Sequence, residues 1–242
     1  MLNKFTLEKH LSKTPVSFQR FIMNQYFMLN KKTEYDYIKY AESLKVFKEN
    51  SCIFVHIPKT AGISVNSIID EINMKSNNNK IYRGGHNPKS LFHNTDEKKY
   101  FTVIREPVER IYSFYQMSLK DKKQPYNYLA KKDLYHFVAY CPEAQNIYCK
   151  YFSGEIEKDM NPDLYNIAQK NIQNFYQILN FSNFENDLSK FLKKIGIEKM
   201  KIPHINKSEK KNIPDDDRKI IEFYNAYDLK LYKFLKSENY LE

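Results

Sequence analysis

The stretch from residue 51 to residue 64, SCIFVHIPKTAGIS, constrains the fold of this 242-residue chain more than any other segment. Residues 53–55 form a short run of β-branched and aromatic side chains, which predicts a buried strand. Pro58 ends that strand because its nitrogen has no hydrogen to donate to a sheet ladder. A tight turn over 59–62 follows, and apolar residues at 65, 68, 69 and 72 share one face of a predicted helix. The segment therefore predicts a strand, a turn and a helix in direct succession.

The turn between this strand and helix carries Lys59, and its chemistry favours an anion. A helix N-terminus presents free N–H groups and a partial positive charge, to which a lysine adds a full charge. An ordinary βα turn with an exposed lysine would give the same local pattern. The GxxxxGK[ST] spacing of a Walker loop is absent, so the segment predicts an anion site of another kind.

A second segment, 100–104, reads YFTVI and predicts another strand that ends at Arg105. Pro107 suits the first position of a helix, which we expect to run to about residue 119. Open α/β sheets bind ligands at the carboxyl ends of their strands, where Arg105 lies. Glu106 and Arg110 are spaced as an ion pair on one helix face, and we interpret them in that way.

Histidines supply the candidate bases. Residues 81–93, IYRGGHNPKSLFH, place His86 among glycines and a proline, in a segment where backbone can approach a ligand closely. A solvated loop histidine is the alternative for this position. His56 lies inside the first strand run and is interpreted as a packed core histidine, while His93 and His204 are weaker candidates for a base.

The rest of the chain alternates helical and strand patterns. Residues 126–172 are mostly helical in pattern, 175–181 predict a strand, 183–194 a helix, and the residues from Pro214 onward further helices. This alternation predicts an α/β fold with a small central parallel sheet flanked by helices, in a single domain over 1–242. Residues 1–50 predict a helical extension packed on that domain, with a membrane-lying or acceptor-gripping role as the alternative.

Composition narrows the classes of partner. The chain has 39 basic and 29 acidic residues, a net charge of +10, which favours a nucleic acid, a membrane surface, a phosphorylated cofactor or an acidic glycan. The lysines are scattered and no base-reading motif is present, so we expect no nucleic-acid partner. The three cysteines do not have the spacing of a metal or redox site, and the sequence shows no apolar signal peptide or membrane-spanning segment. We therefore expect a cytoplasmic protein, with association at the inner membrane surface as an option. No cluster of histidine, cysteine and carboxylate residues predicts a metal.

Two of these segments together, HIPKTAGIS (56–64) and VIREPVERIYSFY (103–115), resemble the cofactor motifs of sulfotransferases that use 3′-phosphoadenosine 5′-phosphosulfate (PAPS). The closest resemblance is to the group of heparan sulfate 2-O-sulfotransferase and bacterial carbohydrate sulfotransferases. Weaker similarities add to it: Gly85-His86 between the motifs, HINKS at 204–208, and the C-terminal helical segment near 227–232. The resemblance spans about 53–235.

The resemblance implies a P-loop-like three-layer sandwich and a carbohydrate O-sulfotransferase that moves a sulfuryl group from PAPS to a hydroxyl of a polysaccharide or glycolipid. Catalysis would rest on positioning and charge stabilisation, with His86 as general base and Lys59 stabilising the leaving phosphate. The implied PAPS-binding residues fall into three sets. The 5′-phosphosulfate would be held by the loop residues Lys59, Thr60, Ala61, Gly62, Ile63 and Ser64, mainly through backbone N–H groups. The 3′-phosphate would be held by Arg105 and Ser113, and Lys207 and Ser208 would close over the nucleotide.

The chain departs from the family pattern in one loop position. Where the common loop reads PKTAGTS, Ile63 replaces the second threonine, so one hydroxyl toward the 5′-phosphate is missing unless Ser64 or backbone N–H groups replace it. Animal members carry a Golgi anchor, and its absence here indicates a bacterial-type enzyme. Two other readings stay open: a nucleotide-dependent kinase on a similar fold, and a non-catalytic module that binds an anionic glycan or nucleotide.

Overall fold

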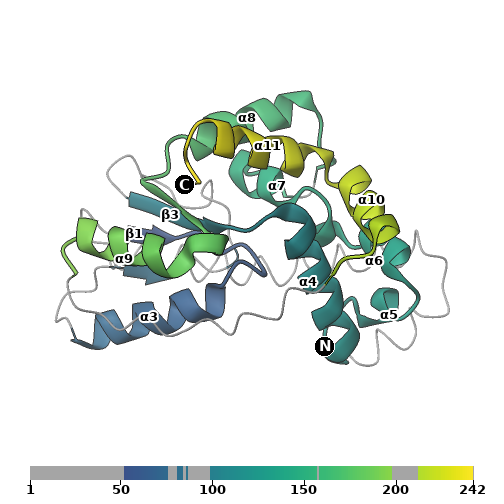
Figure 1. The fold of residues 1–242 in the computed structure, drawn as a ribbon, viewed down its shortest axis with the longest axis horizontal. Helices are drawn as coiled ribbons and strands as arrows, with labels where there is room; N and C mark the ends of the chain where they lie inside the picture. Colours follow the sequence, from purple (N-terminus) through teal and green to yellow (C-terminus); the bar gives the residue numbers. More distant parts are fainter. Residues whose placement is uncertain are drawn as a thin grey trace, which may run out of the picture.

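A four-stranded parallel sheet forms the centre of the protein (Figure 1). The computed structural model describes residues 52–75, 81–83, 86, 99–156, 158–197 and 212–241. In chain order the strands are β1 (Cys52–Phe54), β2 (Ile81–Arg83), β3 (Lys99–Ile104) and β4 (Gln177–Asn180), and their spatial order is β2-β1-β3-β4. Because all of the strands run in the same direction, their carboxyl ends meet at one edge of the sheet.

The register of the two central strands fixes the geometry of that edge. Ile53 of β1 pairs with Tyr100 of β3, and Phe54 pairs with Phe101. The contact continues past β1, because the Val55 N–H donates to the Phe101 carbonyl (2.9 Å) and the Thr102 hydroxyl donates to the Val55 carbonyl (2.9 Å). The segments that leave β1 and β3 are therefore held side by side.

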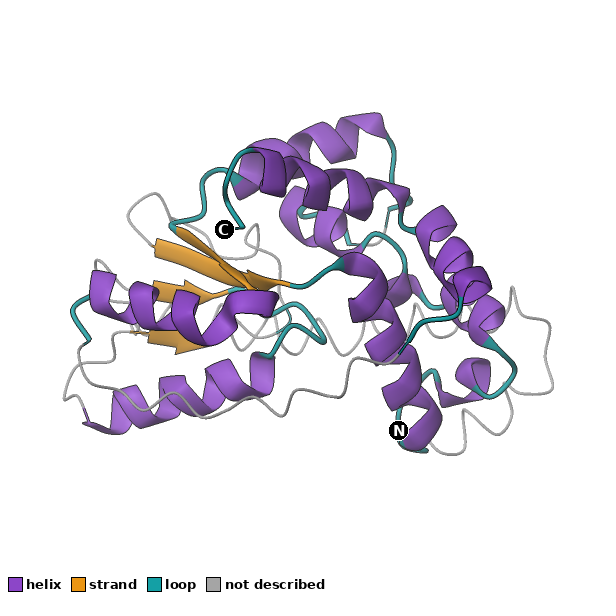
Figure 2. Ribbon diagram, viewed as in Figure 1, coloured by secondary structure: helices purple, strands orange, loops and turns teal. Residues whose placement is uncertain are grey.

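Helices cover both faces of the sheet (Figure 2). Phe54 and Phe101 pack with α3 and α9 on one face, while Ile53 and Tyr100 pack with α7, α8 and α11 on the other, as the alternation of side chains along a strand requires. The helices are α3 (Gly62–Lys75), α4 (Pro107–Lys120), α5 (Asn127–Ala130), α6 (Leu134–Tyr140), α7 (Ile147–Ser153), α8 (Pro162–Ile172), α9 (Phe184–Lys194), α10 (Asp215–Tyr224) and α11 (Ala226–Ser237), with 3₁₀ turns at Pro142–Ala144 and Phe181–Asn183.

A separate apolar cluster holds α4, α5, α6 and α10 together beside the sheet. Val108, Ile111 and Phe114 of α4 are buried in it, with Phe137 of α6 and Ile221 of α10. Figure 1 shows α4 starting where β3 ends, so this helical group adjoins the carboxyl edge of the sheet.

The C-terminal helix is joined to α7 by two reciprocal caps. The Asp228 carboxylate accepts from the N–H groups of Tyr148 (3.0 Å) and Cys149 (2.9 Å), at the N-terminus of α7. The Asn146 side-chain oxygen accepts from the N–H groups of Tyr227 (3.0 Å) and Asp228 (3.1 Å), at the N-terminus of α11. Each helix thus satisfies N–H groups of the other, which would otherwise lack acceptors. Burial raises the pKa of Asp228, and its hydrogen bonds and nearby Arg110 oppose that rise.

Most elements predicted from the sequence are confirmed. The parallel sheet flanked by helices, the strand at 100–104, the helix from Pro107 and the helices after Pro214 are all present. β2 was missed, because three residues are too few for a strand pattern to show within the loop predicted at 81–93. The predicted extension 1–50 and the basic loop near 204–208 lie outside the described residues. Across the residues that are described, none of the helices has both the length and the apolar character needed to cross a bilayer.

Candidate anion site at the carboxyl edge of the sheet

Residues of the loop itself hold the conformation of the connection from β1 to α3. Lys59 and Ala61 both adopt left-handed backbone conformations, with φ of 70° and 68°. Thr60 between them is fully buried, and its hydroxyl donates to the Ile57 carbonyl at 2.8 Å. Because the hydroxyl of Thr60 is already hydrogen-bonded within the turn, Thr60 can offer a ligand its backbone amide. Two left-handed residues in so short a turn are strained, and such strain is common where backbone is shaped around a ligand.

The first turn of α3 provides N–H groups that are not used inside the helix. Within the described residues, the first main-chain hydrogen bond of this helix runs from the Val65 N–H to the Ala61 carbonyl (3.1 Å). The amides of Gly62, Ile63 and Ser64 therefore have no carbonyl partner one turn earlier, as at any helix N-terminus. The Ile63 side chain is 88% exposed and apolar, so Ile63 can offer only its backbone amide to an anion here. These amides form a fixed set of donors for an anion.

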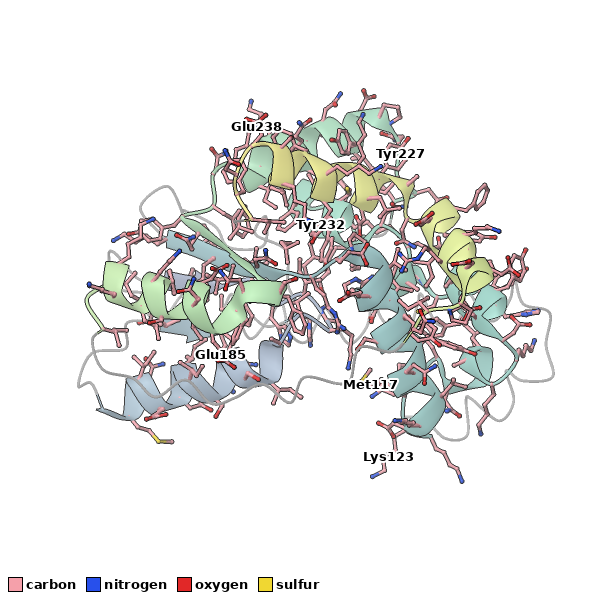
Figure 3. All side chains as sticks on the ribbon, viewed as in Figure 1. Met117, Lys123, Glu185, Tyr227, Tyr232 and Glu238 are labelled. Atoms are coloured by element: carbon pink, nitrogen blue, oxygen red, sulfur yellow. The ribbon has the colours of Figure 1, made fainter. Side chains whose placement is uncertain are left out.

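Lys59 lies between this loop and α4. Its ammonium group donates to the Sδ of Met117 at 3.4 Å, and Figure 3 shows Met117 on α4. A thioether is a weak acceptor, so this contact satisfies a cation poorly. Burial lowers the pKa of Lys59, and the positive charge of Arg105 lowers it further. The two cations predicted from separate motifs are thus close enough to repel each other, and an anion would relieve that repulsion.

Arg105 is held on several sides. Its guanidinium lies over the ring of Phe181, 4.5 Å from the centroid, and its Nε is 3.5 Å from the Glu109 carboxylate. The Tyr148 hydroxyl donates to the Arg105 carbonyl (2.8 Å) and accepts from its N–H (3.2 Å). The side chain is 13% exposed, and a planar fork held in this way suits bidentate binding of a phosphate.

The ion pair predicted between Glu106 and Arg110 is wrong. Glu106 accepts a hydrogen bond from the Glu109 N–H (2.8 Å) and caps the first turn of α4. Arg110 is fully buried, and its Nη2 donates to the Glu143 carbonyl at 3.2 Å. Glu109 of α4 pairs instead with Arg105, which lies just before the helix. Spacing predicted a shared face, but it did not show that this face is partly turned into the protein.

Ser113 lies on the face of α4 that points toward the lysine loop. It is half-buried and one helical turn before Met117, whose sulfur contacts Lys59. The structure therefore brings Ser113 and Lys59 to the same side of α4. Its predicted bond to a 3′-phosphate stays a prediction.

His86 approaches the same loop from β2. Its Nδ1 is 3.1 Å from the carbonyl oxygen of His56, and the two imidazole centroids are 4.2 Å apart. Its own carbonyl accepts from the Tyr151 hydroxyl at 2.9 Å. Burial, and then the charge of His86, lower the pKa of His56 to about 3, so that His56 is neutral at neutral pH. His56 stacks on Phe54 but is only half-buried, so it is not the core histidine that was predicted, and its contact with His86 was not predicted either.

Several predicted residues lie outside this description, and several contacting residues were missed. Gly85, His93, His204, Lys207 and Ser208 are not described, so their roles stay predictions. Met117, Phe181 and Tyr148 were missed because they are apolar or aromatic residues in ordinary helix and loop patterns, without a local signal. Among the described residues, no group of three or more His, Cys, Asp or Glu is placed to hold a metal ion.

Comparison with known proteins adds no assignment. No protein-family model matches this chain. No curated protein matches it at a significant level. The site must therefore be judged on its own geometry.

Proposed function

We propose that the protein is a PAPS-dependent carbohydrate O-sulfotransferase with a P-loop-like fold, which transfers a sulfuryl group to a hydroxyl of a polysaccharide or glycolipid. The observation that supports this best is the proximity of Lys59 and Arg105. They come from the two segments that resemble sulfotransferase motifs and follow adjacent parallel strands, close enough for the charge of Arg105 to lower the pKa of Lys59. Two cations close together at the carboxyl ends of adjacent strands are what two subsites of one anionic nucleotide require.

The donor groups present suit such a nucleotide. PAPS has anionic groups at two places, the 5′-phosphosulfate and the 3′-phosphate. The free amides of Gly62, Ile63 and Ser64 with Lys59 suit the first. The guanidinium of Arg105, with Ser113 further along α4, suits the second. Glu109 already pairs with Arg105, so a phosphate there would share or replace that contact.

Each residue then has a defined role. PAPS, when bound, supplies an activated sulfuryl group. The α3 amides and Lys59 would hold the 5′-phosphosulfate and would stabilise the negative charge of the leaving phosphate. His86 accepts the proton of the acceptor hydroxyl. The Tyr148 hydroxyl holds the backbone of Arg105, whose guanidinium would bind the 3′-phosphate.

Calorimetric titration with adenosine 3′,5′-bisphosphate, AMP and ATP tests the donor site. We expect binding that depends on the 3′-phosphate. Arg105→Ala should weaken that binding at least about tenfold, since a charge-assisted bidentate contact is lost. Arg218→Ala on α10 removes an equal charge outside the two motif segments and serves as the matched control. Preference for ATP would favour the kinase, and an unchanged dissociation constant in Arg105→Ala would refute the assigned 3′-phosphate site.

Transfer itself is tested with PAPS labelled in its sulfuryl group and the acceptors dextran, chondroitin and heparosan. His86→Ala should reduce turnover at least about a hundredfold while leaving the affinity for adenosine 3′,5′-bisphosphate nearly unchanged. Near-normal turnover in that variant would remove His86 from the role of base. Binding of the bisphosphate without transfer to any acceptor would favour the non-catalytic binding module.

A further inference from the structure

The contact between His56 and His86 defines which nitrogen of His86 carries a hydrogen. His86 Nδ1 lies 3.1 Å from the main-chain carbonyl oxygen of His56. A carbonyl oxygen can only accept a hydrogen bond, so Nδ1 must be the donor. In a neutral imidazole the other nitrogen, Nε2, then has the lone pair and is the one able to accept a proton.

We infer that His56 is a positioning residue, which holds His86 as the Nδ1–H tautomer with its ring fixed beside the lysine turn. Free histidine in water favours the opposite tautomer, so the contact selects a form that is otherwise the minor one. His56 comes three residues before Lys59 in the same loop. The nitrogen that accepts the proton and the ammonium that stabilises the leaving group are therefore set by one short segment of backbone.

The ring of His56 contributes separately from its carbonyl. It stacks on Phe54, with centroids 5.4 Å apart and planes inclined by 18°, and it lies against the His86 ring at 4.2 Å with the planes tilted by 35°. A Cβ at Gly62 would overlap this imidazole, so the ring also lies directly against the glycine of the anion loop. A ring confined between a phenylalanine and a helix start cannot turn away, and it gives His86 a rigid surface to lie on.

The charge state of His56 fits this role. Burial and the neighbouring His86 lower the pKa of His56 to about 3, so it is uncharged at neutral pH. A neutral ring does not repel the imidazolium that forms when His86 takes up a proton. The buried Tyr151 of α7 donates to the His86 carbonyl at 2.9 Å, so the main chain of His86 is held as well.

Nitrogen NMR of the full-length, ¹⁵N-labelled protein tests the tautomer directly. Long-range ¹H–¹⁵N correlation distinguishes the two neutral tautomers for each of the six histidines, and His86→Gln assigns the His86 signals. We expect His86 to be the Nδ1–H form at neutral pH. A predominant Nε2–H form would overturn the inference, whether or not the protein transfers sulfuryl groups.

Two variants test the ring. His56→Ala removes it, and we expect mixed tautomers at His86 and a turnover about 10- to 100-fold lower, because the base is no longer aligned. Affinity for adenosine 3′,5′-bisphosphate should stay within about twofold. His56→Phe keeps a flat ring between Phe54 and His86 and should restore both tautomer and turnover. Wild-type tautomer and turnover in His56→Ala would overturn the role of the ring.

This inference rests on the proposed function for its catalytic consequence, but not for its geometry. Turnover is measured with labelled PAPS and whichever of dextran, chondroitin and heparosan is the best acceptor. If none of the three accepts a sulfuryl group, the proposed carbohydrate transfer fails, and the NMR spectra of the wild type and of the two His56 variants still decide the tautomer and the role of the ring. Transfer together with the Nε2–H tautomer would leave the function standing and refute the positioning role.

Discussion

Replacing His56 by phenylalanine should remove a large part of the acid sensitivity of this protein. The ordinary pKa of histidine is 6.5, and burial lowers that of His56 to about 3 in the folded state. Between these values the unfolded chain binds a proton at this position and the folded chain does not. The contribution to stability is therefore complete above pH 6.5 and decreases as the pH falls toward 3.

The size of the effect follows from the difference in bound protons. At pH 5, about 1.5 units below the ordinary pKa, the loss amounts to about 2 kcal/mol at 1.36 kcal/mol per unit. This loss of stability at pH 5 depends little on the folded-state pKa of His56, as long as that pKa lies well below 5. Solvent at the partly exposed edge of the ring screens part of this energy, so we expect at least about 1 kcal/mol.

Urea unfolding at pH 7 and at pH 5 measures this loss. The free energy of unfolding of the wild type should fall between the two pH values by about 1 to 2 kcal/mol more than that of His56→Phe. His136→Phe is the control, because it removes a histidine that lies at the surface beside Asp133. This control should show a loss at least as large as the wild type. Equal losses in wild type and His56→Phe would refute the claim that His56 is buried in a neutral form.

Other packing contacts lead to three further predictions. Asp228→Ala should lower the free energy of unfolding by about 2–4 kcal/mol in urea titration, because two buried N–H groups of α7 lose their acceptor. Gly62→Ala should cost about 1–3 kcal/mol, and much less when His56→Ala is also present, because its new methyl group overlaps the imidazole. Tyr148→Phe should cost about 1 kcal/mol and weaken adenosine 3′,5′-bisphosphate binding in calorimetry, since Arg105 loses its backbone support.

Each of these three predictions has an outcome that would contradict it. Asp216→Ala on the exposed first turn of α10 is the control for the capping aspartate and should change stability by less than about 0.5 kcal/mol. Equal costs for Asp228→Ala and Asp216→Ala would show that the α7 cap contributes little. A cost of Gly62→Ala that persists without the imidazole would mean that the contact with His56 is not its cause. Unchanged nucleotide affinity in Tyr148→Phe would show that Arg105 is positioned by other contacts.

Part of the fold could be predicted from the sequence because it depends on residues that are neighbours in the chain. The apolar run at 53–55, the donor-free Pro58 and the periodic apolar residues after 62 lie next to one another in the chain, so their pattern specifies strand, turn and helix without reference to anything distant. The same holds for β3 and for α4, which begins at Pro107. Parallel strands then place Lys59 and Arg105 at one edge.

The burial of individual polar residues could not be predicted from local sequence patterns. Arg110 and Glu106 have the spacing of a surface ion pair, but α4 packs so that one is inside the protein and the other caps the helix. The reciprocal caps of Asn146 and Asp228 join residues about 80 positions apart, and no local pattern marks either one. Such contacts depend on how whole helices pack, which is decided by the summed burial of many apolar side chains.

The sequence alone therefore determined the succession of most strands and helices, β2 excepted, and the cationic residues at the strand ends, because those features depend on neighbouring residues and on the direction of the chain. Only the tertiary structure decided that the charge of Arg105 reaches Lys59, that Lys59 contacts Met117 of α4, and that the His86 ring lies against the His56 carbonyl. These contacts join parts of the chain 30 to 58 positions apart. Their distances and their shared burial exist only once the sheet and its helices have packed together.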